Sequence, residues 1–363
     1  MQIRQITARH LRLPAAASRF VPLTETSRAA DRPIETVWAE IVTDSGQRGV
    51  GFVIADDATE LVSIIGRSLA PRLIGEPALA QERLYAHIAA TGMPTLLRAY
   101  TALDIAVWDL QGQAASEPLW RIWGGARDKV RVFFDEAVSP SIENRDSITR
   151  CQEAIRQGFQ AVRVSIAGRD AESESRQLVD LRDATGDNVW FAVAVEQSYE
   201  YDTALPMARF LDEEIGADWF EDALPDDDVS GYKLLTLKTE TALAMGRRFQ
   251  TAGQFRALVA AGIPFTLRPD PLRWGGLTPL LKWVAFAAIH HRPVVPHTAT
   301  EISVHLACGL PNVPTVGWDP RLAVLFLNPL SLQQGQLSAP NKPGLGLEPD
   351  YEALERLTVA KVG

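Results

Sequence analysis

The runs FQAVRVSI at residues 159–166, VWFAVAV at 189–195 and DWFE at 218–221 decide the fold class of this chain. Each run is short with an apolar centre, and an amphipathic stretch follows each one. Apolar strands that alternate with helices are typical of a parallel sheet covered on both faces. The same unit recurs on either side, with runs at VRVFF (130–134), TALAM (241–245), PFTLR (264–268), PVVP (293–296) and PTVGW (314–318). Units repeating every roughly 22 to 30 residues fit a closed (β/α) barrel better than an open sheet.

The first third of the chain predicts an α+β domain instead. TVWAEIVT at 36–43 alternates as a half-buried strand does, and turn residues at 44–46 lead into a second strand that ends near Ile54. We expect these two strands to form a hairpin. Helices are expected at 58–69, 78–87 and 99–114, the last of which carries a clear apolar stripe at helical spacing.

Residues 1–24 contain four arginines and no acidic residue, which allows two interpretations. One is a mitochondrial presequence. The other is an edge strand, because Ile3, Leu11 and Leu13 recur between polar residues and Pro14 ends the run. No secretory-type apolar core or small-residue cleavage site is present, so the strand is favoured.

The composition narrows the class of protein further. The chain has 363 residues, a formal charge of −9 and 46% hydrophobic residues, which excludes a mainly disordered chain. The acidic balance argues against a nucleic-acid partner. Cys151 and Cys308 form no C-x-x-C pair, which excludes a disulfide framework and indicates a cytoplasmic location. The apolar stretch 283–289 is far shorter than the about 20 residues of a membrane span, so no membrane partner is expected.

The residues that do the work of such a barrel lie at the carboxyl ends of its strands. The opening of the barrel at these strand ends is called the mouth. Residues two apart on a strand share a face, so Arg163 and Ser165 are both expected to point into the mouth, as are Ala194 and Glu196. The other strand ends carry side chains that can bind ligands or move protons, namely Glu221, Arg247, Arg268, Asp270 and His297. Glu196 and Glu221 would also suit glycoside hydrolysis by paired carboxylates, although nothing else in the sequence favours that reaction.

Three segments carry a resemblance to a known family. They are TALDIAVWDLQGQAASEPLWRIWGGARDKVRVF at 101–133, TLRPDPLRWGGLTPLLKWVA at 266–285 and VVPH at 294–297. With them the chain resembles the enolase superfamily, and within it the mandelate racemase/muconate lactonizing enzyme branch. The resemblance implies an α/β fold in which an N-terminal α+β capping domain closes over a TIM-like (β/α)7β barrel. The expected division is a capping domain at 1–126, a barrel at 127–329 and a C-terminal segment at 330–363 that packs back on the capping domain.

The resemblance also implies a chemistry. Members of the family remove the proton next to a carboxylate and hold the resulting enediolate with Mg²⁺. They then racemise, dehydrate or cycloisomerise the substrate.

Several matching positions have lost the residues of the family. Its K-x-K pair is replaced by Arg163 and Ser165. Its three metal carboxylates align with Ala194, Glu221 and Arg247. Glu196 lies two residues beyond Ala194 on the same face, where it offers a second carboxylate. Arg247 stays protonated and repels a cation, so we expect the magnesium site to be incomplete.

The aspartate and histidine of the family are kept as Asp270 and His297. We expect Asp270 to accept a hydrogen bond from one imidazole nitrogen, which leaves the other nitrogen free as acid or base. The alternative is that both residues are inherited scaffold without a role in turnover.

The arginines have two interpretations. Arg247 and Arg163 would replace Mg²⁺ as fixed cations and grip the substrate carboxylate. Alternatively, Arg247 pairs with Glu221 and fills the vacated site. Ser165 is expected to make room for substrate, because no partner that would activate its hydroxyl is visible in the sequence.

Two functions follow. The first is a lyase or isomerase, of dehydratase or racemase type, that acts on a small hydroxy acid or sugar acid. The second is a pseudoenzyme that binds acid sugars or serves as a scaffold. Either would take a small-molecule carboxylate, and barrels of this kind commonly form homo-oligomers. Substrate choice is expected to depend on residues 15–33 and 44–54.

Overall fold

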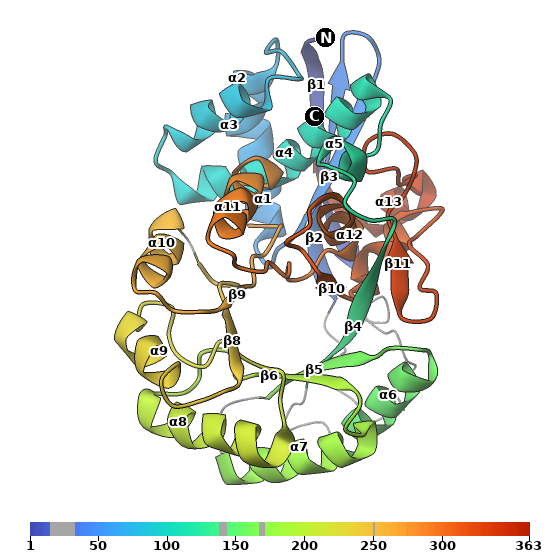
Figure 1. The fold of residues 1–363 in the computed structure, drawn as a ribbon. Helices are drawn as coiled ribbons and strands as arrows, with labels where there is room; N and C mark the ends of the chain where they lie inside the picture. Colours follow the sequence, from blue (N-terminus) through green and yellow to red (C-terminus); the bar gives the residue numbers. More distant parts are fainter. Residues whose placement is uncertain (15–32, 138–143, 167–170, 250, 274) are drawn as a thin grey trace.

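The computed structural model describes residues 1–14, 33–137, 144–166, 171–249, 251–273 and 275–363. A small antiparallel sheet with its own helices stands over a curled parallel sheet, and both termini lie in the upper part (Figure 1). Within these described ranges no helix is long and apolar enough to cross a membrane. The predicted capping domain over a (β/α)7β barrel is confirmed.

The capping domain is built on a sheet of strand order β12-β1-β2-β3, all antiparallel. Its strands are β1 (Ile3–Leu13), β2 (Ile34–Thr43), β3 (Arg48–Ile54) and β12 (Thr358–Val362). The expected hairpin of β2 and β3 is present. The strand expected at the N-terminus is present as β1, but it does not lie at the edge of the sheet, because β12 pairs with its outer side. The domain boundaries near 126 and 329 stay predictions.

The helices of this part cover one face of the sheet. They are α1 (Ala58–Ile64), η3 (Ile65–Leu69), α2 (Ala70–Leu73), α3 (Gln81–Ala89) and α4 (Pro94–Ala115). Helix α4 lies very close to β3. A Cβ atom at Gly51 would lie 2.0 Å from the carbonyl oxygen of Ala102, and one at Gly49 would lie 2.2 Å from that of Ala106. Only glycine permits this approach.

The barrel sheet has the parallel order β10-β4-β5-β6-β7-β8-β9. Its strands are β4 (Lys129–Ala137), β5 (Ala161–Ser165), β6 (Trp190–Ala194), β7 (Trp219–Glu221), β8 (Ala242–Met245), β9 (Thr266–Leu267) and β10 (Thr315–Gly317). A parallel bridge between Leu267 and Val294 supplies the seventh position of the barrel, and β10 pairs with β4.

Helices connect these strands and form the outer layer (Figure 1). They are α6 (Asn144–Arg156), α7 (Ala171–Thr185), α8 (Tyr201–Phe210) with η4 (Leu211–Ile215), α9 (Val229–Leu235), α10 (Ala252–Ala260), α11 (Leu277–Ile289) and α12 (Thr300–Gly309). Shorter elements complete the chain, namely α5 (Leu119–Ile122), η5 (Pro320–Leu325), β11 (Gln336–Ser338) and α13 (Tyr351–Leu357).

The interior of the barrel changes character along the strands. A buried layer of Phe133, Ala192, Trp219, Ala244 and Val295 fills its middle. Residues two apart share a face, so the next inward positions toward the carboxyl ends lie directly above this layer. Among those positions are Asp135, Glu221 and His297, so the apolar layer forms the floor of a polar mouth.

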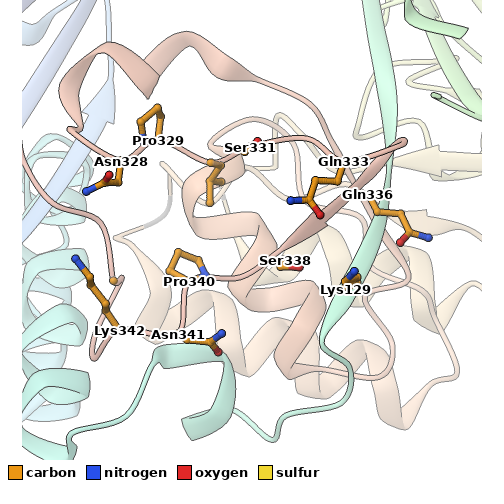
Figure 2. Close-up of a pocket in the computed structure, with 12 residues that line it drawn as sticks. Lys129, Asn328, Pro329, Ser331, Gln333, Gln336, Ser338, Pro340, Asn341 and Lys342 are labelled. Atoms are coloured by element: carbon orange, nitrogen blue, oxygen red, sulfur yellow. The ribbon is translucent and has the colours of Figure 1, made fainter. Parts of the chain in front are cut away.

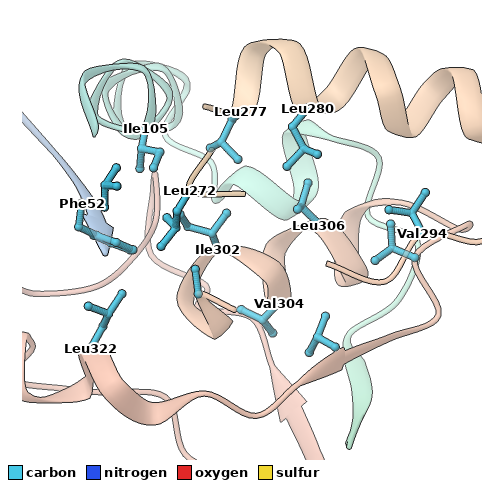
Figure 3. Packing of buried hydrophobic residues seen from close by; sticks show 14 of the residues in the cluster. Phe52, Ile105, Leu272, Leu277, Leu280, Val294, Ile302, Val304, Leu306 and Leu322 are labelled. Carbon is cyan, nitrogen blue, oxygen red and sulfur yellow. The ribbon is translucent and has the colours of Figure 1, made fainter. Parts of the chain in front are cut away.

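Apolar and polar contacts fix the capping domain over this mouth. Figure 3 shows Phe52 of β3 and Ile105 of α4 packed near Ile302 of α12 and Leu322 of η5. Asp104 of α4, fully buried, accepts hydrogen bonds from the backbone N–H and the hydroxyl of Thr278 in α11, at 2.9 and 2.6 Å. The capping domain and the barrel thus share one core.

Candidate active site

The centre of the mouth is a buried carboxylate held by two arginines. Arg163 of β5 donates from Nε and Nη2 to the two oxygens of Glu221 at the end of β7, each at 2.8 Å. Arg268, just after β9, donates from Nε to Glu221 Oε2 at 3.1 Å. Glu221 and Arg268 are both 0% exposed. Such charge-assisted, bidentate pairs are the strongest hydrogen bonds that side chains make.

The charge of Glu221 is set by this pairing. Burial alone would raise the pKa of the carboxyl, but the positive charges of Arg163 and Arg268 outweigh it and lower the pKa to about 2. Arg163 also donates to Asp135 Oδ1 at 2.8 Å and lies 3.4 Å from Glu196 Oε1. The buried guanidinium of Arg163 therefore faces three carboxylates.

Arg268 is enclosed on every side. Its guanidinium lies 5.3 Å from the ring centres of both Phe133 and Trp219, in the floor of the mouth. Its Nη1 donates to the carbonyl oxygens of Val295 and Pro296, at 2.9 and 3.2 Å. These contacts tie the sixth strand of the barrel to the seventh.

His297 lies at the edge of this cluster and is 9% exposed. Its Nδ1 lies 3.4 Å from Nη2 of Arg268. Burial, together with the positive charges of Arg247, Arg268 and Arg163, lowers the pKa of His297 well below its usual value. The imidazole is therefore neutral at physiological pH.

Asp270 does not take the place beside His297 that we expected. Its Oδ1 accepts from the backbone N–H of Leu272 at 2.9 Å and from Thr298 Oγ1 at 3.2 Å, and its Oδ2 accepts from Arg273 Nε at 3.2 Å. Within the described residues no hydrogen bond joins the two side chains. The physical reason is that Asp270 stabilises its own turn, while the guanidinium of Arg268 lies against Nδ1 of His297.

The second correction concerns Arg247, which pairs with Glu196 and not with Glu221. Its Nη1 donates to Glu196 Oε2, and Nη2 of Arg248 lies 3.7 Å from the same oxygen. Glu196 has a left-handed backbone, φ 54°, which redirects the chain just after β6. Burial would raise the pKa of Glu196, but Arg247 and Arg163 lower it.

Ser165 has a partner that was missed. Its hydroxyl donates to Glu196 Oε1 at 2.9 Å. Glu196 thus connects Ser165, Arg163 and Arg247, three of the predicted site residues, at the outer part of the mouth. Because the pKa of Glu196 is lowered, this carboxylate is a weak base and its main effect is to position the hydroxyl.

A further acid lies directly behind the cluster. Asp222 follows Glu221 with φ 49°, is fully buried, and neither carboxylate oxygen has a partner among the described residues. Burial and the charge of Glu221 raise its pKa to about 8. Asp222 is thus largely protonated at neutral pH and adds little negative charge to the mouth.

The site can be tested for its fit to a metal ion. The part of the chain that the structure describes has no group of three or more His, Cys, Asp or Glu side chains arranged to hold a metal. Both oxygens of Glu221 are engaged by guanidinium groups. Mg²⁺ requires several free oxygens in near-octahedral positions, and this cluster presents arginine N–H groups in their place.

A cavity of about 490 Å³ lies between the start of β4 and the C-terminal segment that carries β11 (Figure 2). Lys129, which begins β4, contributes to its wall. The rest of the lining is mostly amide and hydroxyl side chains, among them Asn328, Ser331, Gln333, Gln336, Ser338 and Asn341. Working residues of such barrels lie at the opposite, carboxyl ends of the strands. The mouth, and not this cavity, is therefore the candidate active site.

Comparisons with known proteins identify the family. Residues 13–124 match the mandelate racemase/muconate lactonizing enzyme N-terminal domain, and residues 146–354 match the enolase C-terminal domain-like family. The L-talarate/galactarate dehydratase of Salmonella typhimurium is 26% identical over 90% of this chain and 82% of its own length. The 3,6-anhydro-alpha-L-galactonate cycloisomerase of Streptomyces coelicolor is 26% identical over 93% of this chain and 95% of its own.

A solved structure shows the same likeness. The L-talarate dehydratase from Polaromonas sp. JS666, complexed with Mg and L-glucarate, superposes with a TM-score of 0.88 at 26% identity. The match covers 100% of this chain and 99% of that one. Because the second family match alone spans more than half of the residues, this chain belongs to the mandelate racemase/muconate lactonizing enzyme family of the enolase superfamily.

Proposed function

We propose that the protein is an acid-sugar dehydratase that removes water from a sugar acid after activating the carbon next to the carboxylate. The observation that carries this proposal is the position of His297, which reaches the mouth beside the buried arginines. An imidazole at such a place can donate a hydrogen bond to a substrate oxygen, and fixed guanidinium groups stabilise the negative charge that develops on the substrate. The dehydratases among the relatives support this reaction class over racemisation.

The two arginines predicted to bind substrate have different tasks in this proposal. Arg247 is partly exposed and contacts the carboxylate of the substrate, for which a guanidinium fork is well shaped. Arg163 is 2% exposed and already engaged by Asp135, Glu196 and Glu221, so it acts through its charge. Ser165, positioned by Glu196, offers its oxygen to a substrate hydroxyl.

We further propose that the reaction does not use Mg²⁺ at the family's position. The support is that Glu221 is enclosed by Arg163 and Arg268, while Arg247 stands where the family has a third carboxylate. Guanidinium groups carry the positive charge that an ion would otherwise supply. One preorganised donor of this kind is worth about 3 kcal/mol of barrier in other enzymes.

Several expectations stay open beside this proposal. Of the segments expected to select the substrate, residues 15–32 lie outside the described residues, whereas 44–54 form the turn before β3 and β3 itself. The formation of a homo-oligomer and a cytoplasmic location remain predictions.

The test is a screen of aldonic and aldaric acids in D₂O with EDTA present, followed by NMR. We expect one or more acids to lose water to a 2-keto-3-deoxy acid, and His297→Asn to abolish this turnover while the protein stays folded. A second candidate function, binding of acid sugars without turnover, is favoured by the lost metal carboxylates. Binding of an acid with neither product nor deuterium at the α-carbon, both with EDTA and with added Mg²⁺, would support that alternative and overturn the dehydratase proposal.

A further inference from the structure

We infer that Arg268 fixes His297 with its Nδ1 as a hydrogen-bond acceptor, so that the imidazole presents an N–H group to the mouth instead of a lone pair. Sequence reasoning assigned no role to Arg268. The geometry makes it a positioning residue for His297. The inference about the ring stands on the structure alone, and only its consequence for catalysis rests on the proposed function.

The first step is the position of Arg268, whose N–H groups are almost fully used. Nε donates to Glu221, and Nη1 donates to two backbone carbonyl oxygens, those of Val295 and Pro296. The side chain is completely buried between two aromatic rings. A guanidinium held at three of its five N–H groups cannot turn away, so Nη2 stays directed at Nδ1 of His297, 3.4 Å away.

The second step is the chemistry of the contact. Arginine has only donors, and it keeps its proton at any relevant pH. The ring nitrogen that faces it must therefore be the acceptor. A neutral imidazole carries one N–H and one lone pair, so a lone pair on Nδ1 places the proton on Nε2. The lowered pKa of His297, caused by burial and the nearby arginines, agrees with a neutral ring.

The third step is that, among the residues the structure describes, no carboxylate is hydrogen-bonded to Nδ1 of His297. Asp270, which would favour a proton on Nδ1, is engaged by Leu272, Thr298 and Arg273. The backbone N–H of His297 donates to the carbonyl oxygen of Pro269 at 2.8 Å, and this bond holds the residue against the sixth strand. The contact with Arg268 therefore fixes the orientation of the His297 ring.

This arrangement has a consequence for the reaction. With its proton on Nε2, His297 can donate a hydrogen bond to a substrate oxygen, as neutral imidazoles do in other proton-transfer enzymes. It cannot take a proton from carbon at that nitrogen. In this tautomer His297 stabilises the negative charge that develops on a substrate oxygen.

The experiment is ¹⁵N NMR of the two ring nitrogens in protein labelled with [¹⁵N]histidine, without substrate. His297→Asn identifies the signals among the six histidines. We expect Nε2 to be protonated and Nδ1 to be bare between about pH 6 and pH 8. Asp270→Asn should leave this pattern unchanged, whereas Arg268→Met should allow a proton at Nδ1.

A proton on Nδ1 in the wild-type protein would overturn the inference, as would a change of tautomer in Asp270→Asn. If Arg268→Met does not fold, these two measurements still decide the question. Because no turnover is measured, failure of the tautomer assignment and failure of the dehydratase proposal are independent results.

Discussion

Glu221 in the barrel mouth and Asp104 between the capping domain and the barrel are both carboxylates with 0% exposure, yet the protein treats them in opposite ways. Glu221 is held by two guanidinium groups, and its pKa falls to about 2. Asp104 is held by the N–H and hydroxyl of Thr278, and burial raises its pKa to about 7. The same kind of group, equally buried, is a fixed charge in one place and close to neutral in the other.

The difference lies in the partners. Neutral donors satisfy the lone pairs of a carboxylate without offsetting the loss of hydration of its charge, whereas a guanidinium does both. The interface can therefore use Asp104 simply as an acceptor that joins α4 to α11. The mouth, by contrast, holds several buried or half-buried charges of opposite sign close together. Apolar residues in the same positions would avoid the free-energy cost of removing those charges from water. Retention of such a costly arrangement is typical of a functional site.

The largest effect is expected from Glu221→Gln. Removing this charge leaves Arg163 and Arg268 buried without their shared partner, and breaking a buried pair in this way typically costs about 3 to 5 kcal/mol of unfolding free energy. Urea denaturation measures the change. The exposed pair Lys282–Glu82 provides the control, since Glu82→Gln should have little effect. A loss well under about 1 kcal/mol in Glu221→Gln would mean that the cluster is not a coupled unit.

A smaller effect is expected from Thr278→Val at the interface. This change keeps the shape of the side chain but removes the hydroxyl that donates to Asp104 and accepts from Trp108 Nε1 at 2.9 Å. Leaving buried polar groups without a partner costs about 1 to 3 kcal/mol. Thr278→Ser, which keeps the hydroxyl, should remain within about 1 kcal/mol of the wild type. A larger loss for Thr278→Val than for Glu221→Gln would reverse the comparison.

The third expected effect is a difference in the sign of the pH dependence of stability, which is measured as a slope per pH unit. The pKa of Asp104 is raised by folding, so its contribution to stability is full below about 4 and is lost as the pH rises through about 7. The pKa of Glu221 is lowered, so its contribution is full above about 4.5 and is lost as the pH falls toward 2.

Unfolding free energies measured from pH 3 to pH 8 separate the two groups. The unfolding free energy of the wild type relative to Asp104→Asn should change between about pH 4 and pH 7, by at most about 1.4 kcal/mol per pH unit. The difference between wild type and Glu221→Gln should be flat there and change only below about pH 4.5. Slopes of the same sign for both variants would contradict the assigned partners.

The fold could be predicted from the sequence because its signals are local. Short apolar runs such as VWFAVAV at 189–195 indicate strands that are buried on both faces, and these runs recur at a regular spacing. The position of β12 beside β1 could not be predicted in the same way. Pairing of the two chain ends depends on tertiary contacts that no local pattern encodes.

The members of the site could be predicted, but their partners could not. The strand-end rule placed Arg163, Glu221 and Arg247 at the carboxyl ends of the strands, where Arg163 contacts Glu221 and Arg247 contacts Glu196. The pairing of Arg247 with Glu196 depends on the left-handed backbone of Glu196, which the sequence does not reveal.

The positions of Arg268 and Asp135 in the mouth could have been predicted from the spacing of residues along their strands. Each is a charged residue two positions beyond an inward-facing one, Thr266 and Phe133 respectively, and this spacing places both in the mouth. The family resemblance drew attention to Asp270 instead, and the role of Arg268 beside His297 was missed.

The central proposal is that guanidinium groups take the place of the metal ion in the barrel mouth of this chain. The most direct test is metal analysis of protein purified in Mg²⁺ and dialysed briefly, with the Polaromonas L-talarate dehydratase treated in parallel. We predict no stoichiometric Mg²⁺ in this protein and bound Mg²⁺ in the relative. One tightly held Mg²⁺ per chain, lost in the Glu221→Gln variant, would contradict the account.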